Sequence, residues 1–466
     1  MFLKRPILLL LILTLFTGVS LRAQIATSPD MTWFKDAKFG LFLHWGLYAQ
    51  TAGDWNGHPY KGNERFMLYE RIPVKTYAKI ADQFNPSQFN ADTWVKQAKT
   101  AGMKYIVYTS KHHDGFAMYN SKVSDYNIYK LTPFKRDPLA ELAKACKKYD
   151  IKLCLYYSLG RDWEDPDVPT NWPVKAGRSN TWDFPNEDAK VFNKYFERKV
   201  KPQVTELLKN YGPIAVMWFD TPELISKKES AELRGLISSL QPKCLVNSRI
   251  GNGYGDFGIS EQSLGAASKN SWEACITIGR QWGYNRHDST WKSPELLVRN
   301  LINVVANNGN LLLNVGPMGN GNFPNWAIAR LDSIGDWMKV NGEAITGTRP
   351  YRIASEGNEL ESASISKKDE NSKMKDAIYD GTPKSREADL FFTTKDNYVY
   401  VLLRSWSRKD FDIKSLKGVD VASVQLLGTK KKVGWKTTAT GLTVSLPDDY
   451  ALINKVPVYT LKVKMK

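Results

Sequence analysis

The chain has little of what marks several common classes of protein. Only 4 of its 466 residues are cysteines, and they show neither CxxC spacing nor a histidine partner at zinc-site spacing. We therefore expect Cys146, Cys154, Cys244 and Cys275 to be buried free thiols. The sequence also has no HExxH, no GxSxG and no phosphate-binding glycine loop, which argues against the enzyme classes that depend on those motifs.

Long apolar runs are missing as well. The most apolar segment follows Lys4-Arg5, runs from Ile7 to Leu13 and continues patchily towards the small residue Ala23. It is shorter than the ~20 apolar residues that a membrane-spanning helix needs. A basic start, an apolar centre and a small last residue are typical of a secretory signal. We predict that residues 1–23 are a signal peptide, that the protein is exported to the periplasm or the extracellular space, and that the mature chain does not span a membrane.

The formal charge of +17 comes from Lys and Arg residues that are scattered along the chain. They form no basic block interleaved with aromatic residues, which is the pattern of nucleic-acid binding proteins. We therefore predict no nucleic-acid partner. With 466 residues at 42% hydrophobic content, the chain is long enough for one large domain and a smaller one.

Between Trp33 and about Thr348, short runs of β-branched or aromatic residues alternate with helical apolar patterns. This alternation predicts βα units and a parallel sheet. Helices are expected to start at Asp92, as a cap, and at Asp137-Pro138, which supply a cap and a first-turn proline. The expected strands span Phe39–His44, Tyr105–Thr109, Leu153–Tyr157, Ala215–Phe219, Cys244–Asn247 and Leu311–Val315.

Polar side chains recur where these strands end, as in His44-Trp45-Gly46, Trp218-Phe219-Asp220 and Asn247-Ser248-Arg249. In a (β/α)8 barrel the active site lies at the carboxyl ends of the strands. A doubly wound sheet also binds ligands there, but no strand is followed by its glycine-rich phosphate fingerprint. The pattern favours an α/β fold with a TIM-like (β/α)8 barrel over residues 24–348.

The C-terminal part of the chain has a different pattern. From about Ser355 to Ala388 the sequence is polar and lysine-rich, which is typical of a linker. Beyond it, apolar and polar residues alternate with period two, so we predict a small antiparallel β domain and assign residues 349–466 to it. Its expected strands span Asn397–Leu403, Ala422–Leu427, Leu442–Leu446 and Val456–Val463.

Three acidic residues are candidates for catalysis. Asp220 ends the apolar run Ala215–Phe219, and Glu261 and Glu273 follow later in the chain. Hydrolysis of a glycosidic bond needs two carboxyl groups, one that attacks or activates water and one that protonates the leaving oxygen. Each residue also has a structural explanation, namely a helix cap for Asp220, an exposed loop position for Glu261 and a carboxylate paired with arginine for Glu273. The pattern leaves both explanations open.

His112 and His113 lie beside Asp114, and His44 ends another strand. Histidine and carboxylate are the ligand types of many metal sites. Adjacent residues in an extended segment point in opposite directions, however, so we do not expect the two histidines to share an ion. Hydrogen bonding to sugar hydroxyls is the simpler role, and the 15 tryptophans offer aromatic planes for sugar rings. We predict neither a metal nor another cofactor.

Four motifs together are specific enough to indicate a family. They are Phe39-Gly40-Leu41-Phe42-Leu43-His44-Trp45-Gly46, Lys111-His112-His113-Asp114-Gly115-Phe116, Trp282-Gly283-Tyr284-Asn285 and Gly309-Asn310-Leu311-Leu312-Leu313-Asn314-Val315-Gly316-Pro317. In this order they resemble the motifs of glycoside hydrolase family 29, the α-L-fucosidases, and the resemblance covers about Met31 to Pro350.

The resemblance implies a catalytic (β/α)8 barrel, a C-terminal β-sandwich and a retaining two-step reaction without a metal. It implies that Asp220 is the nucleophile and Glu261 the acid/base, with Glu273 held in reserve. Arg249 matches an arginine that supports the site, and Trp282 matches the aromatic position near the methyl group of fucose. Residues that bind fucose hydroxyls are matched by His44, His112 and His113.

The chain departs from the family pattern after the first barrel strand. Many members carry Glu-Trp there, whereas this chain has Asp54-Trp55 and, further on, Glu64-Arg65. We take Glu64 as the match, because Met67 keeps the register with the following segment. The aromatic residues that we also expect at the sugar are Trp55, Tyr157 and Trp218.

The resulting hypothesis is an exo-acting, retaining α-L-fucosidase that removes terminal fucose from glycans or glycoconjugates by double displacement. Two alternatives remain: a catalytically inactive fucose-binding protein, and a glycosidase for a related sugar such as galactose. The sequence predicts neither the linkage preference nor the oligomeric state.

Overall fold

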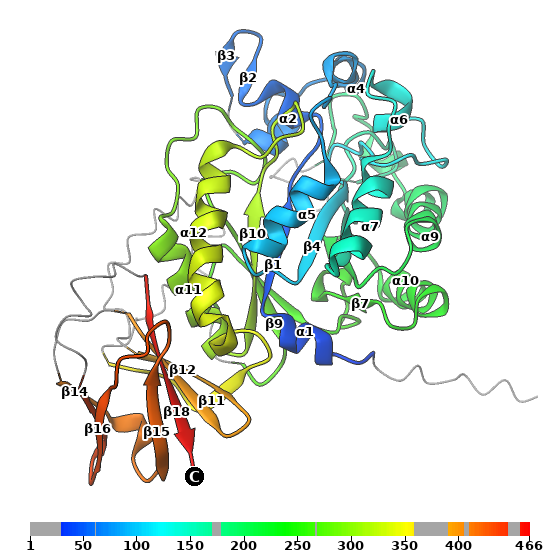
Figure 1. The fold of residues 1–466 in the computed structure, drawn as a ribbon. Coiled ribbons are helices and arrows are strands. Elements are labelled where there is room, and N and C mark those ends of the chain that lie inside the picture. The colour runs from blue at the N-terminus through cyan, green and yellow to red at the C-terminus, as the bar shows by residue number, and fades with distance from the viewer. Residues whose placement is uncertain are drawn as a thin grey trace, which may run out of the picture.

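The computed structural model describes residues 29–60, 62–169, 179–265, 268–357, 390–404, 410–445 and 457–466 (Figure 1). The signal segment predicted at residues 1–23 and most of the predicted linker lie outside these residues. The chain forms a barrel domain followed by an all-β domain, which Figure 1 shows beside α11 and α12, at the end of the barrel opposite the β2–β3 hairpin. Within the described residues, no helix is long and apolar enough to cross a membrane.

The first domain is built on eight parallel strands in the order β7-β6-β5-β4-β1-β10-β9-β8. The two end strands of this sheet meet through a parallel bridge between Asn247 and Phe257, so the sheet closes into a barrel whose strands follow in chain order. The predicted TIM-like barrel is therefore confirmed. Its strands are β1 (Phe39–Leu43), β4 (Tyr105–Lys111), β5 (Lys152–Ser158), β6 (Val216–Asp220), β7 (Leu245–Val246), β8 (Gly258–Glu261), β9 (Trp272–Thr277) and β10 (Gly309–Val315).

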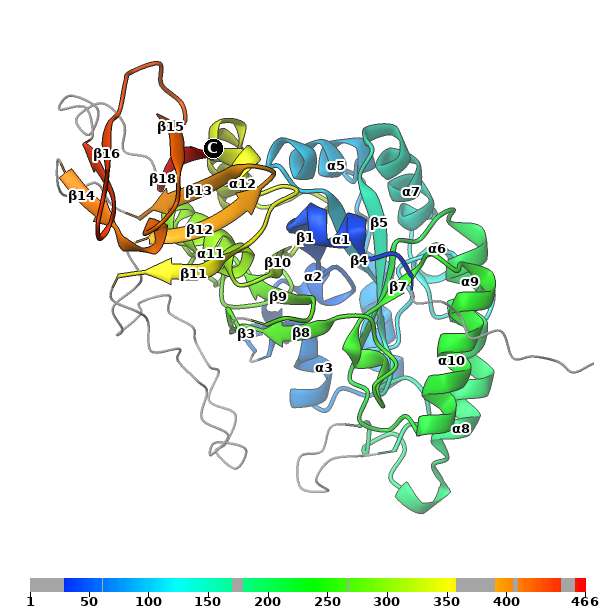
Figure 2. The same ribbon diagram turned by 90° about the horizontal axis from the view of Figure 1, so that it is seen from below.

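Helices surround most of the barrel (Figures 1 and 2). The connections from β7 to β8 and from β8 to β9 differ, because their described residues include a 3-10 turn (Ser248–Ile250) but no α-helix. The helices are α1 (Thr32–Ala37), α2 (Tyr48–Thr51), α3 (Phe66–Tyr69), α4 (Val74–Ala78), α5 (Ala91–Thr100), α6 (Ile128–Leu131), α7 (Pro138–Tyr149), α8 (Phe192–Tyr195), α9 (Lys201–Asn210), α10 (Lys227–Leu240), α11 (Pro294–Ala306) and α12 (Asn325–Asn341).

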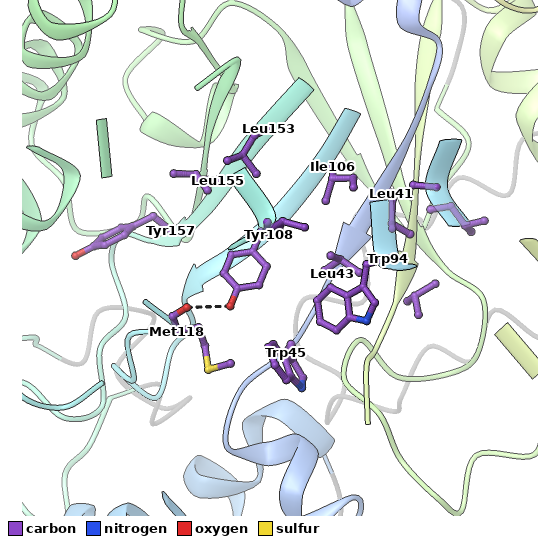
Figure 3. Packing of buried hydrophobic residues seen from close by; sticks show 14 of the residues in the cluster. Leu41, Leu43, Trp45, Trp94, Ile106, Tyr108, Met118, Leu153, Leu155 and Tyr157 are labelled. Carbon is purple, nitrogen blue, oxygen red and sulfur yellow. Dashed lines mark hydrogen bonds between the residues drawn. The ribbon is translucent and has the colours of Figure 1, made fainter. Parts of the chain in front are cut away.

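Apart from β8, the barrel strands are buried on both faces, which is why they are apolar runs without alternation. One core lies between the strands and the helices, and Figure 3 shows part of it around Leu43, Tyr108 and Trp94. A second core fills the inside of the barrel and includes Phe42, Val107, Cys154, Trp218 and Leu312. All four cysteines are buried and free, as predicted.

Several boundaries differ from the sequence prediction. Strands β8 and β9 were not expected, since β8 is short and half-exposed and β9 carries the buried Glu273 in an otherwise apolar run. Helix α5 begins one residue before Asp92, because Asn90 is its cap and accepts a hydrogen bond from the amide of Thr93 at 3.0 Å. The cap predicted at Asp137 is confirmed, with the amide of Ala140 as donor.

The second domain is a β-sandwich. A five-stranded sheet, β11-β12-β13-β18-β15, and a three-stranded sheet, β14-β17-β16, enclose one apolar core. Trp337 of α12 donates to the carbonyl of Val458 at 2.9 Å, which ties this domain to the barrel. Strand bounds are β11 (Arg349–Glu356), β12 (Leu390–Lys395), β13 (Tyr398–Leu403), β14 (Asp410–Ile413), β15 (Val421–Leu426), β16 (Gly434–Thr438), β17 (Gly441–Ser445) and β18 (Tyr459–Met465). The small hairpin of β2 (Asp54–Trp55) and β3 (His58–Pro59) belongs to the barrel domain.

Candidate active site

Asp220 is the last residue of β6 and lies at the carboxyl-terminal mouth of the barrel. Its Oδ2 accepts a hydrogen bond from the hydroxyl of Tyr156 at 2.9 Å, and its Oδ1 accepts one from the amide of Thr221 at 2.8 Å. Burial acts to raise the pKa of Asp220, but Arg249, Arg161, the Tyr156 hydroxyl and His112 together hold the pKa below its usual value. Asp220 is therefore a fixed carboxylate that stays ionised.

Arg249 brings Asp220 and Glu261 together. It comes from the turn after β7, and Glu261 is the last residue of β8. Nη1 of Arg249 lies 2.6 Å from Oδ1 of Asp220, and Nη2 of Arg249 lies 2.5 Å from Oε2 of Glu261. One guanidinium group therefore contacts both carboxylates that the family resemblance selected, Asp220 and Glu261. The Glu261 side chain is 42% exposed, whereas that of Asp220 is 15% exposed.

His44 is the residue after β1, and its ring faces the same site. Its Nδ1 lies 2.7 Å from Oδ1 of Asn314, whose amide nitrogen donates to the carbonyl of Trp282. Because the amide nitrogen of Asn314 is used in that bond, its Oδ1 must accept from a protonated Nδ1 of His44. Burial lowers the pKa of His44 to about 4. His44 is therefore neutral, and its unprotonated Nε2 can accept a hydrogen bond from a hydroxyl group.

His113 has the same arrangement. Its Nδ1 lies 2.6 Å from Oγ of Ser158, and that hydroxyl donates to the carbonyl of Arg161 at 2.8 Å. Since the one hydroxyl proton of Ser158 is used, Nδ1 of His113 must be the donor in their bond. Nε2 is then the acceptor, and it lies 3.7 Å from Oδ2 of Asp220. Burial lowers the pKa of His113 well below its usual value.

The expectation that His112 and His113 point in opposite directions is wrong. Their ring centroids are only 4.2 Å apart, because the chain leaves the strand and turns, with the amide of Gly115 donating to the carbonyl of His112. The Nδ1 of His112 is buried and has no hydrogen-bond partner among the described residues. Even so, the described part of the chain contains no cluster of three or more His, Cys, Asp or Glu side chains arranged to hold a metal ion.

Trp282 and Glu64 line the side of the site near β1 and β10. The Trp282 ring lies 4.9 Å from that of His44, centroid to centroid. Glu64 is buried, and its Oε1 lies 3.4 Å from Nε of Arg65. Burial raises the pKa of Glu64 above its usual value. Trp55 is on the β2–β3 hairpin, where it packs against Phe66.

The structure places Tyr157 away from these residues. Its side chain lies in the layer between strands and helices, with Leu153 and Leu155 (Figure 3), and its hydroxyl donates to Gln203 of α9. The neighbouring Tyr156 faces the barrel interior and bonds to Asp220, so the sequence prediction selected the wrong one of two adjacent tyrosines.

Glu273 lies inside the barrel beneath the site. It is 1% exposed, and it accepts hydrogen bonds from the hydroxyl of Tyr105 at 2.5 Å and from Nε1 of Trp218 at 2.8 Å. The expected arginine partner is replaced by these two neutral donors. Trp218 in turn lies under the guanidinium of Arg249, 5.3 Å from Cζ to the ring centroid. Both residues therefore form the floor of the site.

A closed parallel barrel that holds two carboxylates around one arginine, with neutral histidines beside them, has the groups that a glycoside hydrolase needs. The family model of the α-L-fucosidases matches residues 21–343, and that of the α-L-fucosidase C-terminal domain matches residues 384–464. The chain belongs to the α-L-fucosidase family, whose members are glycoside hydrolases.

Relatives and solved structures agree with this assignment along most of the chain. A putative α-L-fucosidase of Caenorhabditis elegans is 29% identical, with 94% of this chain and 90% of that protein covered. The structure of α-L-fucosidase isoenzyme 1 from Paenibacillus thiaminolyticus has a TM-score of 0.79 at 31% identity and covers 94% of this chain and 98% of that chain. AlfC from Lactobacillus casei, solved with its α-L-fucose product, is 41% identical with a TM-score of 0.64, and covers 66% of this chain and 98% of that chain.

Proposed function

We propose that this protein is an exo-acting, retaining α-L-fucosidase in which Asp220 is the nucleophile and Glu261 the acid/base. The observation that carries this assignment is the position of Arg249, which contacts both carboxylates. Glu273 is less suitable, because it lies inside the barrel with both oxygens hydrogen-bonded to core side chains. The substrate is a fucosylated glycan or glycoconjugate.

In the first step an oxygen of Asp220 attacks the anomeric carbon of fucose while the bond to the leaving oxygen breaks. Glu261 gives its proton to that oxygen, so the rest of the glycan departs as an alcohol. For this transfer Glu261 has to leave Arg249, and its exposed position at the end of β8 gives it room to move. The product of this step is a fucosyl ester of Asp220.

In the second step Glu261, now a carboxylate, takes a proton from water. The water oxygen attacks the anomeric carbon, the ester bond breaks and fucose leaves with its original configuration. Asp220 departs as a carboxylate, which Arg249 and the Tyr156 hydroxyl stabilise at 2.6 and 2.9 Å. The same two donors keep Asp220 ionised and oriented before the attack and stabilise it as the leaving group in the release.

The neutral histidines account for recognition of the sugar. The unprotonated Nε2 atoms of His44 and His113 accept hydrogen bonds from fucose hydroxyls, and Trp282 gives the methyl side of the sugar an apolar wall. An inactive fucose-binding protein would not need an ionised Asp220 next to Glu261. Comparing turnover of aryl α-L-fucoside and aryl β-galactoside tests the remaining alternative, because the methyl side distinguishes the two sugars.

We further propose that the protein is exported, with residues 1–23 removed. The basic, apolar and small-residue sequence of that segment supports this proposal. Expression of the full chain in a secreting host, followed by mass spectrometry of the N-terminal peptide, tests it. A mature N-terminus at Gln24 in the exported fraction agrees with the proposal, and an intact Met1 in the cytoplasm contradicts it.

The decisive experiment for the activity is release of nitrophenol from 4-nitrophenyl α-L-fucoside by the wild type and by Asp220→Asn. The amide cannot act as the nucleophile but keeps the shape of the side chain, so turnover should fall by a factor of about 10⁴ or more. Saturation binding of free fucose to both proteins is the control for an intact site. If Asp220→Asn remained active, the assignment of the nucleophile would be wrong.

A further inference from the structure

The segment that follows β5 lies directly against the segment that follows β6. The amide of Leu159 donates to the carbonyl of Asp220 at 2.9 Å, and a Cβ on Gly160 would lie only 2.2 Å from the carbonyl oxygen of Thr221. No side chain fits in that gap, which explains why a glycine occupies it. Arg161, the next residue, is therefore held at a fixed position next to the end of β6.

Arg161 is a buried cation with incomplete pairing. Only 9% of its surface is exposed, and its Nη2 pairs with Oε1 of Glu223 at 2.9 Å. Its Nε is buried without a hydrogen-bond partner in the described part of the chain. A buried guanidinium that leaves an N–H unpaired lowers stability. A contribution to the site therefore explains its presence better than packing does.

The charge of Arg161 lowers the pKa of two residues of the site, one an acid and the other a base. Burial raises the pKa of Asp220, whereas Arg249 and then Arg161 lower it. Burial also lowers the pKa of His113, and Arg161 lowers it further. One cation therefore favours an ionised nucleophile and an uncharged imidazole at the same time. Both states are required by the proposed reaction.

The backbone of Arg161 acts on His113 as well. Its carbonyl accepts the only proton of the Ser158 hydroxyl, which obliges Ser158 to accept from Nδ1 of His113. The proton of the imidazole is thereby kept on the nitrogen that faces away from Asp220. Without this carbonyl, Ser158 could donate to Nδ1 of His113, and the imidazole proton could move to Nε2. A protonated Nε2 would no longer accept a hydrogen bond from a sugar hydroxyl.

We propose that Arg161 is a positioning residue of the reaction: its carbonyl sets the tautomer of His113, and its guanidinium, anchored by Glu223, is a second cation beside Asp220. This inference rests on the proposed role of Asp220 as nucleophile. Other charged or titratable groups that interact with Asp220 are Arg249, Tyr156, His44, His112, His113 and Cys275. None of them shares the position of Arg161 between the two loops.

The test is the pH profile of kcat/KM for 4-nitrophenyl α-L-fucoside in the wild type, Arg161→Met, Arg161→Gln and Arg161→Lys. Both neutral variants should lose about tenfold on the acidic side, a usual cost for losing a supporting interaction around a site. Their acidic limb should move to higher pH, because Asp220 then takes up a proton more readily. Arg161→Lys keeps the charge and should keep the limb close to that of the wild type.

Arg198→Met is the matched control. Arg198 also pairs with the loop after β5, through Asp165 and Asp167 at 2.7 Å, but it is half-exposed and bonded away from Asp220. Its removal should leave the acidic limb unchanged. Arg161→Gln, which can keep a hydrogen bond to Glu223, provides a neutral variant if Arg161→Met does not fold.

Two results would overturn the inference. One is an equal loss of kcat/KM at every pH, with the acidic limb of the profile unmoved, and the other is no loss of kcat/KM in either neutral variant. An inactive wild type would instead count against the proposed fucosidase activity, so the two failures are distinguishable in one series of measurements.

Discussion

Replacing Glu273 with glutamine separates a structural carboxyl group from a catalytic one. Burial raises the pKa of Glu273 from 4.5 to about 7, despite hydrogen bonds from Tyr105 and Trp218 that act to lower it. The folded protein therefore holds this proton more tightly than the unfolded chain does. The resulting stabilisation is complete below about pH 4.5 and is lost as the pH rises to about 7.

The magnitude follows from the difference between the two pKa values. The pKa of Glu273 is about two and a half higher in the folded protein than in the unfolded chain, which corresponds to roughly 3 kcal/mol in the free energy of unfolding. Glu273→Gln cannot ionise, so its stability relative to the wild type should rise by this order between pH 4.5 and pH 7. In thermal unfolding this amounts to a gain of several degrees in Tm relative to the wild type. Calorimetry at matched pH values measures it, and the other titrating groups cancel in the difference.

Fucosidase activity of the same variant gives the second measurement. Loss of a general acid lowers the reaction rate about 10²- to 10⁴-fold. The glutamine keeps the shape of Glu273 and one carbonyl acceptor, so we expect kcat to change less than about threefold. Glu343→Gln, which alters a surface carboxylate paired with Lys462, is the control for a charge change outside the barrel. A pH-independent stability difference, or a hundredfold loss of activity that azide reverses, would refute the reasoning.

Two further predictions concern residues at the mouth of the barrel. Glu261→Ala should keep the first step on an aryl fucoside, because this leaving group needs no proton, but the second step should be slow. Added azide should restore turnover and give fucosyl azide as the product. An azide response in Glu273→Ala alone would contradict this prediction. Tyr156→Phe removes a hydrogen bond to Asp220 and should lower kcat about tenfold. Tyr157→Phe should leave kcat unchanged and lower the free energy of unfolding by about 1 kcal/mol, because the hydroxyl of Tyr157 donates to Gln203. Steady-state kinetics and thermal unfolding of both variants distinguish the two tyrosines, and equal effects on kcat would count against the placement of Tyr157.

The barrel was predictable because its strands leave a strong signal. Six of the eight are apolar runs that end in polar residues, and Asp220 was found because it is the first polar residue after such a run. Strand β8 was missed, since its four residues are half-exposed and resemble a loop. The sequence pattern therefore left Glu261 and Glu273 as equal candidates for the acid, and only the family resemblance favoured Glu261.

The choice between Tyr156 and Tyr157 required information that the sequence does not contain. Successive residues of a strand face opposite sides, but β5 is apolar on both sides, so no alternation reveals which side faces the interior. The pairing of Tyr156 with Trp218 and of Ser158 with Asp220 reveals it once the register is known. Arg161 was missed for a different reason: its position depends on the path of a loop, which has no periodic pattern.

The closure of the barrel between β7 and β8 bears on how such an enzyme can change. Glu261 is carried by a four-residue strand in a part of the barrel whose described connections include no α-helix, and a single bridge joins that strand to β7. The connection from β7 to β8 is anchored by the buried side chains of Ile250 and Phe257, whereas residues 251–256 between them are half-exposed or exposed. Insertions or deletions between these two anchors displace little packed surface, and Asp220 stays in place on β6. Selection for a different fucosyl linkage, in nature or in the laboratory, would find its most tolerant positions along this seam.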